Sequence, residues 1–353
     1  MSTSTIPARF SPMALIHRDP WSARLLVVMA GLLVFFAVMR PSQFFSLRTW
    51  SSMATQFPEY GLLALGVMVT MFTAGIDLSV VAIANLTGIC TAMLLRAWVG
   101  TSGGVGASLT SVLIAVATAA VVGTACGAFN GFLVSRLKIP AILATLGTLE
   151  LFGGIAIILT EGKPMSGLPK AFGAVFAHKL FGAIPMSLLI FIVCAIIAGL
   201  ILSVTGFGKK ILMLGTNETA ARFSGMQIRS LLMRTYIMSG ILAAIAGIVM
   251  LAAYNSAKAD NGASYTLLTV LIVVLGGVNP NGGSGRLTGV ILSILMLQVL
   301  SSGLNMFTNI SNFYRALIWG VVLLVVITVN EMKIDNPFAR LRKGRTENEN
   351  PAK

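Results

Sequence analysis

The chain has 353 residues, of which 56% are hydrophobic and only 10% are charged. Soluble domains carry about a quarter charged residues, so this composition excludes an ordinary soluble protein and indicates an integral membrane protein. The formal net charge of +14 does not indicate nucleic-acid binding. The basic residues lie in the breaks between apolar runs rather than on one face with aromatic residues.

Ten apolar windows are long enough for a helix to cross, or nearly cross, the hydrocarbon core of a bilayer. They are, in chain order, 23–39, 57–73, 78–95, 107–135, 141–160, 184–204, 232–254, 264–278, 287–304 and 312–330. No clear cleavage site follows the first window, so we interpret it as an uncleaved span rather than a signal peptide. The sequence therefore predicts an all-α integral membrane protein of about ten transmembrane helices, some of them broken or re-entrant.

The distribution of basic residues predicts the orientation. When the windows alternate across the membrane from a cytoplasmic N-terminus, 17 of the 25 Lys and Arg residues fall on the cytoplasmic side, as the positive-inside rule requires. This predicts a cytoplasmic N-terminal tail (1–22), a transmembrane domain (23–330) and a basic cytoplasmic C-terminal tail (331–353). The longest cytoplasmic loop is then 205–231, and 161–183 is an external loop in which we expect a short helix.

A regular pattern of small residues marks the fourth window. Ala115, Ala119, Gly123, Gly127 and Gly131 recur every four residues and therefore lie on one face of a helix. Such a seam lets a second helix approach closely, so the pattern predicts a tightly packed bundle.

We single out two acidic residues in or beside the predicted spans, where an ionisable side chain is costly and is by default a candidate for function. Asp77, in "GIDLS", lies at a break between two windows, and we favour a helix cap by Asp77 or Ser79 over a role in transport. Glu150, in "LGTLELFGG", is the only acid predicted near mid-membrane; it either faces the transport pathway or is held inside the bundle. The glycine- and asparagine-rich break "GGVNPNGGSGR" (276–286) predicts a re-entrant turn that shapes the same pathway. The candidate pathway residues are Asp77, Asn85, Asn130, Glu150, Asn279 and Asn305.

The sequence contains no catalytic or metal-binding constellation. There is no nucleophile elbow, no HExxH, no pair of carboxylates on one helix and no GxxxxGK[ST] phosphate-binding loop. The cysteines (Cys90, Cys126 and Cys194) lie in apolar runs at spacings that indicate neither a disulfide framework nor a metal site. We therefore predict a protein that is not an enzyme and needs no cofactor or metal of its own.

Five motifs together resemble the permease subunits of ribose/galactose-type ABC importers over about residues 57–330. They are "GIDLS", "GAFNGFLVSRLKIPAILATLGTL", "GTNETAARFSG", "SGILAAIAGIVMLA" and "VLGGVNPNGGSGRLTG". The resemblance implies a homo- or heterodimer of permease subunits in the bacterial inner membrane, which docks two cytoplasmic ATPase subunits. It also implies a periplasmic or extracellular solute-binding protein that delivers a small sugar-like substrate. Within the family, "FNGFLVSRLKIPAILATLGTL" and "EGKPMSGLP" are most similar to permeases for rhamnose-like sugars or the furanosyl autoinducer. Glu150 and Gly153 depart from the family, in which a small residue and an Arg are common at these two positions.

The stretch "GTNETAARFSG" (215–225) is similar to the coupling loop by which such permeases contact the ATPase. Its own residues predict a short polar helix, since Asn217 can cap its start and Glu218 with Arg222 forms an i,i+4 pair. Phe223 is of the type enriched as an anchor at interfaces; the alternative is an ordinary solvated loop. The candidate ATPase-coupling residues are Asn217, Glu218, Ala221, Arg222, Phe223 and Gly225.

Three functions are compatible with these observations. The first is the permease of a binding-protein-dependent ABC importer, for which a separate ATPase subunit supplies the energy. The second is a stand-alone ion-coupled secondary transporter that uses Glu150 or Asp77 as its proton site, and the third is a channel. The polar loop 205–231 favours the first, because neither alternative needs a docking element.

Overall fold

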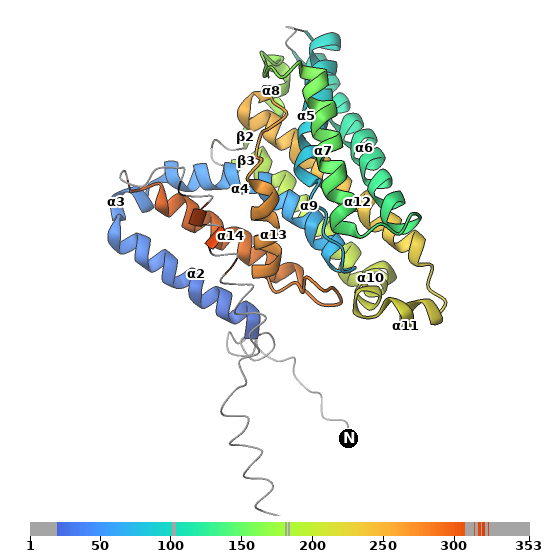
Figure 1. The fold of residues 1–353 in the computed structure, drawn as a ribbon. Helices are drawn as coiled ribbons and strands as arrows, with labels where there is room; N and C mark the ends of the chain where they lie inside the picture. Colours follow the sequence, from blue (N-terminus) through green and yellow to red (C-terminus); the bar gives the residue numbers. More distant parts are fainter. Residues whose placement is uncertain are drawn as a thin grey trace, which may run out of the picture.

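A computed structural model describes residues 20–100, 104–180, 182 and 184–307, together with positions 314, 317, 318, 320, 321 and 324. The C-terminal tail, most of the N-terminal tail and most of the predicted span 312–330 lie outside the described residues. Within them, nine of the ten apolar windows coincide with helices, which confirms a multi-pass helical membrane protein (Figure 1). These helices are α2 (Pro20–Met39), α4 (Leu47–Met71), α5 (Val80–Trp98), α6 (Val105–Ser135), α7 (Ala141–Thr160), α9 (Met186–Val204), α12 (Ile228–Tyr254), α13 (Tyr265–Leu275) and α14 (Leu287–Leu304).

Seven of the described helices are long and apolar enough to cross a membrane, and α4 and α13 are the two exceptions among those that fall on windows. Helix α13 has 11 residues, which is too short for a full crossing. Helix α4 begins ten residues before its window, since its first part is too polar to belong to an apolar run, and it continues without a break through Pro58. The short α13 agrees with the expectation that some helices are short, whereas α4 is longer than its window and unbroken.

Short elements join the long helices. Four are helices: α3 (Pro41–Phe44), α8 (Lys170–Phe176), α10 (Gly206–Thr216) and α11 (Glu218–Phe223). Two are antiparallel two-stranded sheets with strands of two residues: β1 (Met165–Ser166) pairs with the distant β4 (Ser256–Ala257), and β2 (Lys179–Leu180) pairs with β3 (Ile184–Pro185). Helix α8 is the short helix expected in the loop 161–183.

Helix α12 lies at the centre of the bundle and packs against α4, α5 and α6. The small residues of α6 face it: a Cβ added to Gly127 would lie 2.4 Å from the Tyr236 carbonyl oxygen, and one added to Gly123 would lie 2.7 Å from the Gly240 carbonyl oxygen. Two backbones this close leave no room for side chains between them. The predicted small-residue seam is therefore confirmed as a site of close helix packing.

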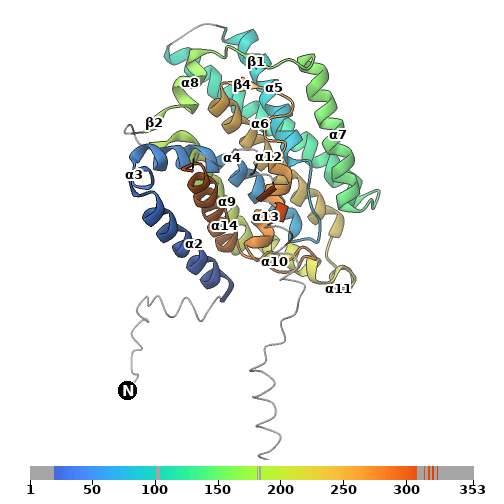
Figure 2. The same cartoon turned by 60° about the vertical axis from the view of Figure 1, so that its left-hand side comes forward.

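The ends of the helices form two opposite faces, with α10, α11 and the start of α2 on one and α3, α8 and the paired strands on the other (Figures 1 and 2). We call them the α11 face and the α8 face. On the α11 face, the Trp21 indole donates a hydrogen bond to the Leu275 carbonyl oxygen at 2.9 Å. On the α8 face, Arg96 donates to the carbonyl oxygen of Ser166. Between the faces, α7 and α9 turn apolar side chains such as Ile158 and Leu200 outward, as a lipid-facing surface requires.

Candidate functional site

Helix α11 lies at an exposed corner of the α11 face, and its first turn is capped. Asn217 has extended backbone angles (φ −159°, ψ 102°), and its side-chain oxygen accepts the Ala220 N–H at 2.9 Å. The Arg222 guanidinium donates to the Glu218 carboxylate at 2.8 Å, as the i,i+4 spacing predicts. Because both side chains are more than half exposed, this pair contributes only about 0.3–0.5 kcal/mol. These contacts fix the shape of a six-residue helix that could not form alone.

The candidate coupling residues divide between two sides of α11. Ala221 is only 3% exposed and packs with Leu214 and Leu231, so it attaches the helix to α10 and α12. Phe223 is 88% exposed, and Gly225 has a left-handed backbone (φ 76°) with no atom within 4 Å of an added Cβ. The outward side thus presents a bare aromatic ring beside an open glycine.

The end of α10 is in close contact with two breaks in the membrane helices. The Gly283 N–H donates to the Phe72 carbonyl oxygen at 3.1 Å, which joins the α13–α14 break to the α4–α5 break. A Cβ added to Gly215 would lie 2.0 Å from that same oxygen and 2.5 Å from the Gly283 nitrogen. We call these contacts among Phe72, Gly215 and Gly283 the glycine junction; in it the end of α10 is packed directly against both breaks, with no space for a side chain at Gly215.

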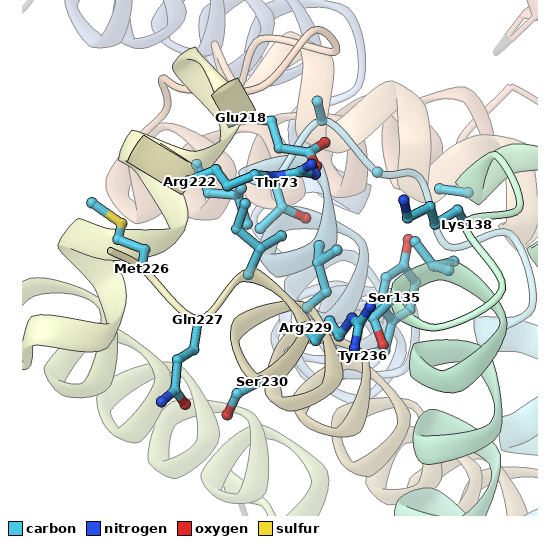
Figure 3. Close-up of a pocket in the computed structure, with 18 of the residues that line it drawn as sticks. Thr73, Ser135, Lys138, Glu218, Arg222, Met226, Gln227, Arg229, Ser230 and Tyr236 are labelled. Atoms are coloured by element: carbon cyan, nitrogen blue, oxygen red, sulfur yellow. The ribbon is translucent and has the colours of Figure 1, made fainter. Parts of the chain in front are cut away.

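A pocket of about 970 Å³ opens beside α11 on the same face (Figure 3). Its walls come from four segments: the α4–α5 break, the α6–α7 loop, the α10–α11 turn and the start of α12. We call it the α11 pocket. Its lining includes the charged side chains of Lys138, Glu218, Arg222 and Arg229 and the hydroxyl-bearing side chain of Tyr236.

Asp77 is fully buried inside the bundle, where it joins three helices. One carboxylate oxygen accepts the backbone N–H and the hydroxyl of Ser79 at 3.0 and 2.6 Å, and the other accepts the Ser239 hydroxyl at 2.8 Å. The Asn130 amide donates to the Ser79 hydroxyl at 2.7 Å. Ser79 precedes α5 and makes no capping bond with its own side chain, so Asp77 supplies the acceptor there. The geometry agrees with the interpretation of Asp77 as a helix cap. In addition, the hydrogen bonds from Ser239 and Asn130 connect this cap to α12 and α6.

The structure brings Asp77 and Asn130 together, but it separates them from the other candidate pathway residues. The Asn85 amide donates to the carbonyl oxygens of Ala259 and Asn261 at 2.8 and 2.9 Å, holding the loop before α13 on the α8 face. The last three candidates lie elsewhere: Asn279 is exposed in the α13–α14 break, Asn305 is exposed at the end of α14, and Glu150 is exposed midway along α7.

A family model described as "Branched-chain amino acid transport system / permease component" matches residues 49–327, most of the chain. This chain belongs to that permease family. It is the permease component of a binding-protein-dependent ABC importer, which makes it a transporter subunit rather than an enzyme. Membership of the family decides against the secondary transporter and the channel.

Three relatives show the range of the similarity. The permease is 30% identical over 303 residues to the ribose import permease protein RbsC of Bacillus subtilis (86% of this chain, 90% of the relative). It is 31% identical over 313 residues to the L-arabinose transport system permease protein AraH of Escherichia coli (88% and 90%). It is 30% identical over 321 residues to the autoinducer 2 import system permease protein LsrD of Yersinia pseudotuberculosis (89% and 92%). No solved structure matches it. The similarity confirms the family, but identities this close to one another do not rank the solutes.

Sequence reasoning missed one buried acid of the permease. Glu59, near the middle of α4, is 3% exposed and accepts the Tyr254 hydroxyl at 2.7 Å and the Tyr265 hydroxyl at 3.5 Å. The adjacent Tyr60 donates to the Gln298 side chain. An acid inside the apolar window 57–73 was the available signal, but both tyrosines are about 200 positions away in the chain. Two acidic side chains thus lie within helices that coincide with apolar windows: Glu150 in α7 and Glu59 in α4.

Proposed function

We propose that this permease moves a small sugar or sugar-like solute into the cytoplasm, driven by ATP hydrolysis on separate ATPase subunits that dock on α11. The observation that carries the proposal is Phe223, an aromatic side chain 88% exposed at the end of a short polar helix. Burying a phenylalanine side chain is worth roughly 1.5–3 kcal/mol, and buried aromatic anchors dominate binding at interfaces. A docking partner explains why α11 presents this ring to solvent.

The basic residues support placing the α11 face in the cytoplasm. On this face the α6–α7 loop carries Arg136 and Lys138, the first turn of α12 carries Arg229, and α10 carries Lys209 and Lys210. This is the charge bias that sets orientation in the membrane. We infer a bacterial inner-membrane protein with both termini in the cytoplasm and a solute-binding protein docking on the opposite, α8 face.

The proposal of a sugar-like solute rests on the printed names of the relatives, which include ribose, L-arabinose and autoinducer 2. The family description instead names a branched-chain amino acid system, so membership alone leaves the solute open. Similarity in "EGKPMSGLP" and in the α6–α7 region favours a rhamnose-like sugar or the furanosyl autoinducer among sugar-like solutes.

We infer that Glu150 faces a second permease subunit, which is either a copy of this chain or a related one. A charged side chain at the centre of a membrane helix costs on the order of 3 kcal/mol in lipid, and Glu150 is exposed there. Nothing lies within 4 Å of a Cβ added to Gly147 or Gly154, so a second subunit has room to approach this side of α7. A hydrated pathway between two subunits would cover the carboxyl group without lipid contact.

Among the remaining pathway candidates, Asn305, at the end of α14, is our candidate for the entrance of the pathway, and Asn279, in the α13–α14 break at the opposite end of the bundle, is our candidate for its exit. We assign Asp77, Asn85 and Asn130 to the structure of the bundle, because their hydrogen bonds are made within one protomer.

The test is binding-protein-stimulated ATP hydrolysis by the reconstituted complex, comparing Phe223→Ala with Phe35→Ala. Phe35 is also exposed (49%) but lies within the membrane helix α2, outside both proposed docking surfaces, so it controls for the loss of an exposed ring. We expect Phe223→Ala to insert normally and to lose stimulation at least tenfold, and Phe35→Ala to retain it. Full stimulation and uptake with Phe223→Ala would show that α11 is not the coupling element.

A further inference from the structure

The α11 pocket has an excess of positive charge. Lys138, from the α6–α7 loop, and Arg229, from the first turn of α12, both line it, and neither forms an ion pair among the described residues. Glu218 is the one acidic side chain in the described lining, and it is already paired with Arg222. Two cations without a counter-charge in one cavity are complementary to an anionic occupant.

A buried hydroxyl points to the same chemistry. Tyr236 lines the α11 pocket yet is fully buried, and its hydroxyl oxygen has no hydrogen-bond partner among the described residues. Buried polar atoms are paired in the great majority of cases, so an unpaired one at a cavity calls for an occupant. Figure 3 shows Tyr236 and Arg229 on α12 and Lys138 on the α6–α7 loop, all bordering the cavity. All three side chains can donate hydrogen bonds, and a carboxylate can accept them.

The size and position of the α11 pocket favour a protein segment as its occupant. A volume of about 970 Å³ holds several side chains rather than one ion. The tails of this chain do not complement it, since residues 331–353 carry six basic against four acidic residues and 1–19 carry Arg9 and Arg18 against Asp19. Glu218 and Arg222 of α11 line the pocket, so a partner that docks on α11 lies beside the pocket.

We propose that the α11 pocket receives an acidic segment of the ATPase subunit, whose carboxylates bind Lys138 and Arg229. This rests on the proposed function and adds to it a second, ionic attachment beside the apolar one at Phe223. The same pocket is walled by Thr73, Ala74 and Gly75 of the α4–α5 break. An inserted segment therefore contacts the membrane helices directly, without acting through α11.

The experiment measures binding of the cognate ATPase subunit to purified permease in detergent without the solute-binding protein. The variant is Lys138→Glu/Arg229→Glu, and the matched control is Lys209→Glu/Lys210→Glu. The control makes the same change of charge at two exposed residues of α10 that do not line the pocket. We expect the pocket variant to weaken association at least tenfold and to flatten its dependence on salt, and the control to change it less than threefold. Equal weakening by both pairs would reduce the effect to general electrostatics and overturn the proposal.

Tyr236→Phe keeps the test decisive if the charge reversals disturb folding. Removing an unpaired buried hydroxyl should leave the melting temperature unchanged or higher, while association with the ATPase weakens a few-fold. Unchanged association in this variant and in the double reversal overturns the pocket proposal. The proposed function survives that result as long as Phe223→Ala still abolishes coupling.

Anionic lipid is the other source of a negative group. The association measurement is repeated in nanodiscs of phosphatidylcholine and of phosphatidylglycerol. If the double reversal weakens association only in phosphatidylglycerol, the pocket binds a lipid headgroup and the proposal is wrong.

Discussion

Asp77 shows how one buried acid can hold a membrane bundle together. Its carboxylate accepts three hydrogen bonds, from Ser79 and Ser239, and so joins the α4–α5 break to α12. The acid occupies a position where a charge would otherwise be costly, and each bond to it removes a donor that would be unsatisfied in lipid.

We predict that Asp77→Ala destabilises the permease by about 1–3 kcal/mol, because at least two buried donors lose their acceptor. Thermal unfolding of the purified protein measures the effect. Asp260→Ala is the control, since Asp260 forms only a partly exposed pair with Lys258 and should have little effect. A fully stable Asp77→Ala protein that no longer transports would instead assign Asp77 to the pathway.

Glu150→Gln tests the residue on the exposed side of α7. The substitution keeps the shape of the side chain and removes its charge, so we expect normal insertion and an altered rate of solute uptake. Glu161→Gln, at the exposed end of the same helix, serves as the control and should transport normally. Unchanged uptake by Glu150→Gln would remove Glu150 from the pathway.

At the residue scale, local contacts could be predicted and distant ones could not. The Asn217 cap and the Glu218–Arg222 pair follow from spacings of three and four residues. Glu59 accepts hydrogen bonds from two tyrosine hydroxyls only because α4, α12 and α13 pack together. No residue spacing within one helix predicts such a contact.

Among the elements, α10 and α11 connect the proposed docking surface to the membrane helices. Helix α11 holds the exposed ring, and α10 ends in the glycine junction. At Gly215 a side chain is excluded by the Phe72 carbonyl oxygen, 2.0 Å from the position of an added Cβ.

We therefore predict that Gly215→Ala displaces α10 and lowers uptake at least tenfold while the ATPase still binds, because Phe223 and the α11 pocket keep their side chains. Gly206→Ala is the matched control: it lies at the start of α10 with no atom within 4 Å of an added Cβ. Uptake and ATPase association are measured on the same preparations. Normal uptake by Gly215→Ala would mean that the junction carries no coupling.

Hydrophobic windows predicted the long helices well because burial in lipid requires both apolar composition and length. They performed less well where a helix is amphipathic or short. The first part of α4 is polar, and α10 begins with two glycines and two lysines and has an apolar run of only four residues, Ile211 to Leu214. Neither segment forms an apolar window, so the loop 205–231 contains one more helix than the sequence indicated.

At the scale of the whole molecule, the order of the windows predicted which segments share a face. The α4–α5 break, α10, α11 and the α13–α14 break meet on one face, and the loop 161–183 meets the loop before α13 on the other. In the pathway that we propose between two subunits, the closing contacts would involve a second chain, so no pattern in a single sequence could supply them.

The orientation of the two faces gives a direct prediction. Single cysteines at Ser166 and Thr216, both exposed, are placed in a background without Cys90, Cys126 and Cys194. An impermeant thiol reagent added to intact cells should label position 166 and spare position 216, and inverted vesicles should give the opposite result. Labelling of position 216 from outside, with position 166 protected, would invert the proposed topology.

The central claim is that this chain forms the pathway and takes its energy from a separate ATPase. The most direct test is uptake of labelled ribose, L-arabinose, rhamnose or autoinducer 2 into proteoliposomes that hold the permease with its cognate ATPase and solute-binding protein. We predict uptake of one of these solutes only when ATP, the ATPase and the binding protein are all present, and none by the permease alone under a proton gradient. Uptake by the permease alone, driven by that gradient, would contradict the account.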